Sequence, residues 1–336
     1  MKKILIITRN PLVHPRQMKD GRGITDDGLY QFIINDAGCN PDFVVVNSKG
    51  LRQATMFNVP RSRIILVTDE PYSVLAYPKG YYRQFGTVIT TQREIRSCDG
   101  TKVIHMHTLL PWYVGMTWEP DHSNRITMTY DDIRKATPEK TKLLSVVSSY
   151  KAFSRGHVER RRFVRRLLDR YGNKVDVFGE GIRDFRDKWD VLAPYRYQIA
   201  IENSCNPDYW TEKLADCFLT NTYPLYHGCP NASDFFPSDA FTAIDIRRAD
   251  EAFRQIDEAI DNDLFSKRQH EMLAAKELVL DKYNLFSCLA RICDGIDDTT
   301  TGCTTINPAS KYFSWHNFCL YTVGRTYYKL NNKLIP

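Results

Sequence analysis

The sequence lacks the features that mark membrane and secreted proteins. Its 336 residues contain no run of eighteen apolar residues, so hydropathy predicts no membrane-spanning helix. The apolar run after Met1-Lys2-Lys3 has four residues, too few for the hydrophobic part of a secretory signal. Since no export signal is visible, we expect a cytoplasmic location.

Cysteine patterns typical of zinc sites or disulfide scaffolds are also missing. The nine cysteines form no CxxC pair, and none lies near histidines at a ligand spacing. His105 and His107 are spaced to share one face of an expected strand, but no third ligand is near them in the sequence. We therefore expect no bound metal.

Neither sign of charge dominates strongly, but the positive charge is unevenly distributed. The net charge is +6, seven arginines lie between positions 155 and 170, and the last 26 residues contain no acidic residue. Such clustering suits an anionic ligand or an anionic membrane surface. It does not indicate nucleic-acid binding, because the arginines are confined to one element without aromatic residues for base stacking.

The length and composition indicate a soluble protein of two domains. A hydrophobic fraction of 43% and a charged fraction of 26% are ordinary for globular proteins, and 336 residues exceed one ordinary core. Short apolar runs in the first part predict buried parallel strands at 3–7, 42–47, 61–68, 86–90 and 102–106. With a helix expected over 26–37, they predict a Rossmann-like α/β domain over 1–135.

The second part repeats this alternation. Strands are expected at 142–148, 174–178, 197–201 and 223–226, and helices at 158–171, 250–262, 264–280 and 285–296. They predict a second Rossmann-like domain over 142–296. The tail, 297–336, is aromatic and basic; either it contacts a membrane peripherally or it packs back on the first domain.

One stretch concentrates polar side chains between a strand and a helix. Within twelve residues it contains two carboxylates, a carboxamide, a phenol and an ammonium: Glu202, Asn203, Tyr209, Glu212 and Lys213. Strand carboxyl ends and helix N-termini direct free backbone N–H groups into one crevice. This stretch therefore predicts a binding site.

The same stretch resembles the signature of the α-1,3/4-fucosyltransferases, glycosyltransferase family 10. The matching motifs read IENS at 201–204, YWTEK at 209–213 and PLYHGCP at 224–230. Spacing back from Phe163 and Leu167 matches Arg160 to an arginine of the family, and Glu70-Pro71 resembles the end of a strand in its N-terminal domain.

The resemblance implies a GT-B fold, in which two Rossmann-like domains face each other across a cleft. It implies inverting transfer from GDP-L-fucose to an oligosaccharide or glycolipid, with no metal and no cofactor besides this donor. The donor residues would be Arg160, Asn203, Tyr209, Glu212 and Lys213. Glu70 would be the catalytic base, with Asp69 as the alternative because the register of the strand end is open.

Two other interpretations remain open at this point. The same fold could use another nucleotide sugar, because donor specificity depends on the shape of the pocket. The chain could also be a non-catalytic protein that binds glycans or nucleotides.

Overall fold

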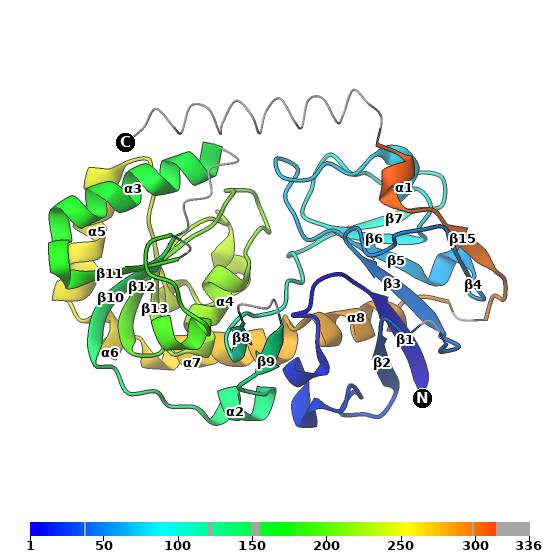
Figure 1. The fold of residues 1–336 in the computed structure, drawn as a ribbon, viewed down its shortest axis with the longest axis horizontal. Coiled ribbons are helices and arrows are strands. Elements are labelled where there is room, and N and C mark those ends of the chain that lie inside the picture. Colours follow the sequence, from blue (N-terminus) through cyan, green and yellow to red (C-terminus); the bar gives the residue numbers. More distant parts are fainter. Residues whose placement is uncertain (37, 120–122, 149–154, 180, 298, 314–336) are drawn as a thin grey trace. The chain divides into compact units, whose positions relative to one another are not determined.

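A computed structural model describes residues 1–36, 38–119, 123–148, 155–179, 181–297 and 299–313 (Figure 1). The described residues form two compact units. Unit 1 contains 1–111 and 281–313, and unit 2 contains 112–280. No helix in these ranges is long and apolar enough to cross a membrane.

Unit 1 is built on a six-stranded parallel sheet. Its strand order is β2-β1-β3-β5-β6-β7, formed by β1 (Lys2–Ile7), β2 (Tyr30–Ile34), β3 (Phe43–Asn47), β5 (Ile64–Val67), β6 (Thr87–Thr90) and β7 (Lys102–His105). Helix α8 (Leu285–Asp294) packs on one face through Phe286 and Leu289. The short helix α1 (Lys79–Tyr82) contributes Tyr81 to the core on the other face. A small antiparallel pair, β4 (Thr55–Phe57) and β15 (Thr304–Ile306), completes the unit.

The helix predicted over 26–37 is wrong, because this segment contains strand β2. Asp27 accepts a hydrogen bond from the backbone of Leu29 and Gly28 has φ +69°, so the chain turns there. Tyr30 and Phe32 are then buried in alternation, which is the period of a strand. Pairing with β1 decided between two patterns that the short apolar run could fit equally well.

Unit 2 contains a five-stranded parallel sheet in the order β11-β10-β12-β13-β14. The strands are β10 (Lys142–Val147), β11 (Val175–Phe178), β12 (Tyr195–Ile201), β13 (Tyr223–His227) and β14 (Thr242–Ala243). The helices are α2 (Tyr130–Lys135), α3 (Arg155–Tyr171), α4 (Glu212–Leu219), α5 (Ala249–Asp261), α6 (Leu264–Lys267) and α7 (Gln269–Glu277). An antiparallel pair, β8 (Met116–Trp118) and β9 (Asn124–Ile126), lies at the start of the unit.

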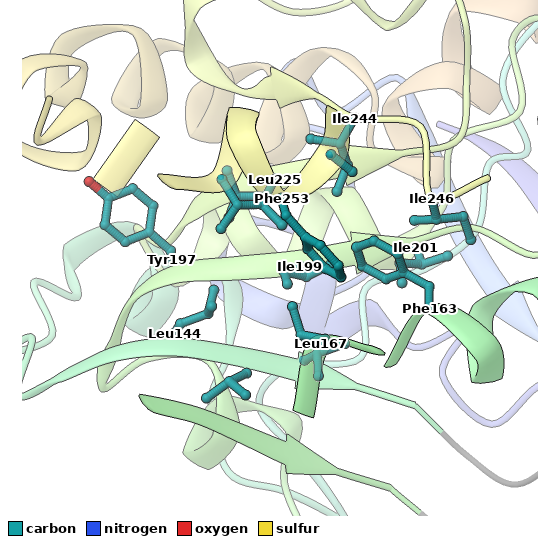
Figure 2. Packing of buried hydrophobic residues seen from close by; sticks show 14 of the residues in the cluster. Leu144, Phe163, Leu167, Tyr197, Ile199, Ile201, Leu225, Ile244, Ile246 and Phe253 are labelled. Atoms are coloured by element: carbon teal, nitrogen blue, oxygen red, sulfur yellow. The ribbon is translucent and has the colours of Figure 1, made fainter. Parts of the chain in front are cut away.

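Apolar side chains from α3, α5 and β12 meet in one core cluster (Figure 2). The rings of Phe163 and Phe253 stack with centroids 5.2 Å apart, and Ile199 is fully buried in the same cluster. This packing fixes α3 to the sheet through Phe163, Val164 and Leu167, which recur at helical spacing. The helix therefore holds its first turn at the carboxyl edge of β10 and β12.

The unit boundaries differ from the predicted domain limits. Residues 112–135 belong to unit 2, and α8 belongs to unit 1, because its buried residues pack on the first sheet. At the beginning of the tail, the ring of Tyr312 lies 6.2 Å from that of Tyr81 within unit 1. The remainder of the predicted membrane-contacting tail, 314–336, lies outside the described residues.

Candidate functional site

A cavity of about 540 Å³ lies in unit 2 at the carboxyl edge of its sheet. It is bordered by the ends of β10, β11 and β12 and by the first turns of α3 and α4. Four of the predicted donor residues line it: Arg160, Asn203, Glu212 and Lys213. The fold thus brings together residues from two helices and one strand end.

Arg160 comes from the second turn of α3 and is held against the end of β12. Its Nη1 donates a hydrogen bond to Oδ1 of Asn203 at 2.9 Å, while its buried Nε has no hydrogen-bond partner among the residues that the structure describes. The helix can approach this closely because position 156 is glycine. A Cβ there would lie 2.4 Å from the carbonyl oxygen of Asn203. The unpaired Nε–H of Arg160 leaves a buried donor that a ligand oxygen would satisfy.

Glu202 organises the start of α4. Its carboxylate accepts hydrogen bonds from the backbone N–H of Thr211 at 2.8 Å and from the hydroxyl of Thr211 at 2.8 and 2.9 Å. Thr211 is the N-cap of the helix and accepts from the backbone N–H of Lys213. Glu202 therefore acts on the site through Thr211, whose position sets the direction of the helix N-terminus.

The ammonium of Lys213 is shared between two buried carboxylates. Its Nζ lies 3.0 Å from Oε1 of Glu212 and 3.5 Å from Oε2 of Glu202. Burial alone would lower the pKa of Lys213, but Glu212 and Glu202 raise it above its usual value. The side chain is therefore a permanent cation.

Burial also shifts the pKa values of the other charged groups of the site. Burial lowers the pKa of Arg160 to about 10, which leaves it charged at neutral pH. Burial also raises the pKa of Glu202. For Glu212, burial acts in the same direction, but Lys213 and Lys188 outweigh it and lower the pKa. Glu212 is therefore held as a carboxylate.

The fifth predicted donor residue, Tyr209, is placed differently. Its side chain is 2% exposed and is not among the described residues that line the cavity. Sequence reasoning also missed other residues that line it, among them Tyr113, Trp118 and Lys188. Tyr113 and Trp118 lie in the segment assigned to the other domain, and no local pattern marks them.

Glu70 and Asp69 follow strand β5 in unit 1. The backbone carbonyl of Glu70 accepts a hydrogen bond from the side-chain amide of Gln92 at 2.8 Å. One carboxylate oxygen of Asp69 is buried and has no hydrogen-bond partner within the described ranges, and burial raises the pKa of this carboxyl. Both residues lie at a strand carboxyl end, as predicted.

Two Rossmann-like α/β units, the second with a cation-lined cavity at its sheet edge, have the GT-B fold of glycosyltransferases. A solved α1,3-fucosyltransferase structure with GDP shares this fold. Its TM-score is 0.50 at 16% identity, over 87% of this chain and 90% of that chain. Residues 137–271 match the family model for the glycosyltransferase family 10 (fucosyltransferase) C-terminal domain.

Known relatives match over the same part of the chain. An α-(1,3)-fucosyltransferase of Helicobacter pylori is 33% identical over 72 residues, which are 21% of this chain and 15% of that protein. An α-(1,3)-fucosyltransferase B of Drosophila melanogaster is 32% identical over 85 residues, 24% of this chain and 19% of that protein. The matched stretches thus span less than a fifth of these relatives.

Proposed function

We propose that this protein transfers L-fucose from GDP-L-fucose to a hydroxyl group of a glycan acceptor, with inversion at the anomeric carbon. One observation carries the proposal: the family-matching residues Arg160, Asn203, Glu212 and Lys213 line a single cavity. A buried guanidinium N–H of Arg160, which has no partner in the described part of the chain, supports an anionic ligand there.

The cations supply what a leaving diphosphate requires. As the bond between the anomeric carbon and the phosphate oxygen breaks, negative charge develops on that oxygen. Lys213 lies in the first turn of α4, where the helix dipole adds to its charge, and Arg160 lies in the second turn of α3. They would stabilise the transition state more than the bound donor, so no metal ion is required for this role in our proposal.

Glu212 and Asn203 suit the neutral parts of the donor. A carboxylate accepts hydrogen bonds from ribose or sugar hydroxyls, and a carboxamide both donates and accepts. Asn203 already uses its oxygen for Arg160, so its amide N–H groups are the part that remains for the ligand. Glu202 positions the site through Thr211.

Inverting transfer is a single displacement and requires one base. The acceptor hydroxyl attacks the anomeric carbon, its proton passes to the base, and GDP leaves with the electron pair of the broken bond. We assign the base to Glu70 of unit 1, with Asp69 as the alternative. General base catalysis of this kind contributes about 10²–10⁴-fold to rate.

A second acceptor class has specific support. A zebrafish relative named GDP-fucose protein O-fucosyltransferase 3 is 22% identical over 235 residues, 61% of this chain. A bovine protein of the same name is 30% identical over 95 residues. A protein hydroxyl is therefore the alternative to a glycan hydroxyl as the acceptor.

The direct test is donor binding followed by transfer. Purified protein is incubated with GDP-fucose, GDP-mannose or UDP-glucose, and thermal unfolding and GDP release are measured with glycan and protein acceptors. We expect stabilisation by GDP-fucose and acceptor-dependent GDP release that persists in EDTA. Stabilisation by UDP-glucose alone would assign another donor, and donor binding without release on any acceptor would favour a non-catalytic protein.

A further inference from the structure

Lys188 is a buried cation in the wall of the candidate donor cavity. It begins a 3-10 turn, Lys188–Val191, between β11 and β12, and the residue is 8% exposed. Its side chain lines the same cavity as Arg160 and Lys213. None of the sequence motifs points to it.

One carboxylate holds Lys188 in place. Its Nζ lies 2.7 Å from Oδ2 of Asp216, a fully buried residue one turn beyond Glu212 in α4. The other oxygen of Asp216 accepts the backbone N–H of Tyr113 at 3.0 Å. Because both oxygens of Asp216 are engaged, the direction of the lysine side chain is fixed.

The ammonium has more donors than the protein uses. A lysine carries three N–H donors, and among the described residues Asp216 is the only hydrogen-bonding partner of Nζ. The ring of Tyr113 lies 5.6 Å from Nζ, which covers part of the ammonium with an aromatic face. Two donors remain for groups inside the cavity.

Lys188 also acts electrostatically on the donor residues. Its charge helps to lower the pKa of Glu212, so the ammonium is close enough to affect that carboxylate. The cavity wall thus combines three cations, Arg160, Lys188 and Lys213, with the carboxylates Asp184 and Glu212. The buried carboxylates Glu202 and Asp216 pair with Lys213 and Lys188. A bound diphosphate would add negative charge to the cavity. Its oxygens would accept hydrogen bonds from the N–H groups of the cations that have no partner among the described residues.

We infer that Lys188, positioned by Asp216, is a third cation for the diphosphate of the bound nucleotide, beside Arg160 and Lys213. This inference rests on the proposed function, since it takes a nucleoside diphosphate as the ligand of the cavity. Hydrogen bonds between an ammonium and phosphate oxygens are charge-assisted and stronger than neutral ones. Lys188 would therefore contribute to ligand binding and not to the chemical step. Its contribution should be larger for ligands that carry a diphosphate than for ligands without phosphate.

The test compares ligands that differ only in phosphate, by isothermal titration calorimetry. Affinities for GDP, GMP and guanosine are measured for the wild type and for the double variant Lys188→Met/Asp216→Asn. The double variant removes both charges, because Lys188→Met alone would leave a buried unpaired carboxylate. Lys142→Met is the matched control, since its half-exposed ammonium pairs with Asp176 and does not line the cavity.

We expect the double variant to bind GDP about tenfold or more weakly than the wild type, and guanosine within about twofold, as expected for the loss of a charge-assisted contact to phosphate. The control should bind both ligands like the wild type. Unchanged GDP affinity, or equal losses for GDP and guanosine, would overturn the inference. Cooperative thermal unfolding of the variant confirms that it is folded.

Inorganic pyrophosphate separates this inference from the proposed function. If the wild type binds pyrophosphate in a Lys188-dependent way but not GDP, the donor assignment fails and the anion role of Lys188 stands. If the wild type binds neither ligand, both are overturned. Binding of GDP with no dependence on Lys188 overturns this inference alone.

Discussion

The guanidinium of Arg160 donates to the side-chain oxygen of Asn203 across 2.9 Å, which links the first turns of α3 to the end of β12. Asn203 thus fixes the orientation of the buried Arg160 guanidinium, although the two residues are 43 positions apart in the sequence. The geometry of the anion site therefore depends on a carboxamide as well as on the arginine itself.

Asn203→Ala removes this alignment and should weaken GDP binding. A hydrogen bond to a charged group contributes roughly 1.5–3 kcal/mol, so we expect a loss of about tenfold to a hundredfold in affinity. Calorimetry with GDP measures it. The exposed Asn262, whose amide caps the end of α5, gives the matched control Asn262→Ala, for which GDP affinity should not change. Wild-type affinity in Asn203→Ala would show that Arg160 needs no such partner.

Glu70→Gln should separate binding from chemistry. Because the described residues that line the donor cavity all belong to unit 2, GDP should bind with unchanged affinity. Transfer should fall by about 10²–10⁴-fold if the carboxylate is the base. Asp69→Asn is the comparison. A loss of that size in Asp69→Asn, with Glu70→Gln retaining activity, would assign the base to Asp69.

Tyr209→Phe should have little effect on the donor. The ring is buried and does not belong to the described cavity lining, so we expect GDP affinity within about twofold of wild type, the effect of a substitution away from the ligand. Calorimetry on the same ligand decides the point. A larger loss would return Tyr209 to the donor-binding residues that the sequence indicated.

Gly228→Ala should disturb the site through Glu202. A Cβ at this position would lie 2.4 Å from Cγ of Glu202 and 2.5 Å from the hydroxyl oxygen of Tyr226. Overpacking costs about 1–3 kcal/mol, and displacement of Glu202 would release the N-cap of α4. We expect a lower thermal midpoint and weaker GDP binding. Gly295→Ala, where the nearest contact is 3.6 Å, is the control that should show neither effect.

The buried His107 should make unit 1 less stable in acid. Burial lowers its pKa to about 3, while the unfolded chain retains a value near 6.5. Below pH 6.5 the unfolded state therefore binds a proton that the folded state does not, and stability falls with falling pH. Between pH 6.5 and 5 this loss is up to roughly 2 kcal/mol.

Urea unfolding at pH 7.5 and pH 5.0 measures this effect. The difference in unfolding free energy between the two pH values should be smaller in His107→Gln than in the wild type. The exposed His270 provides the control His270→Gln, which should retain the wild-type difference. An unchanged difference in His107→Gln would show that other groups cause the acid sensitivity.

The sequence by itself determined the local structure around the site. Strand β12, the polar turn after it and helix α4 are contiguous, so their order and the positions of Asn203, Glu212 and Lys213 follow from one stretch of chain. The helix expected over 158–171 is likewise confirmed by α3, whose apolar residues recur at helical spacing. Periodicity and N-cap chemistry are properties of neighbouring residues, and for this reason they can be read without a fold.

Only the tertiary structure decided which distant residues complete the cavity. Lys188 meets Asp216 across 28 positions, and the backbone of Tyr113 reaches the same carboxylate from 103 positions away. Residues 30–34 form strand β2 because they pair with β1, although the local pattern predicts a helix over 26–37. These contacts depend on strand order and on how helices pack against a sheet, and no local pattern specifies either.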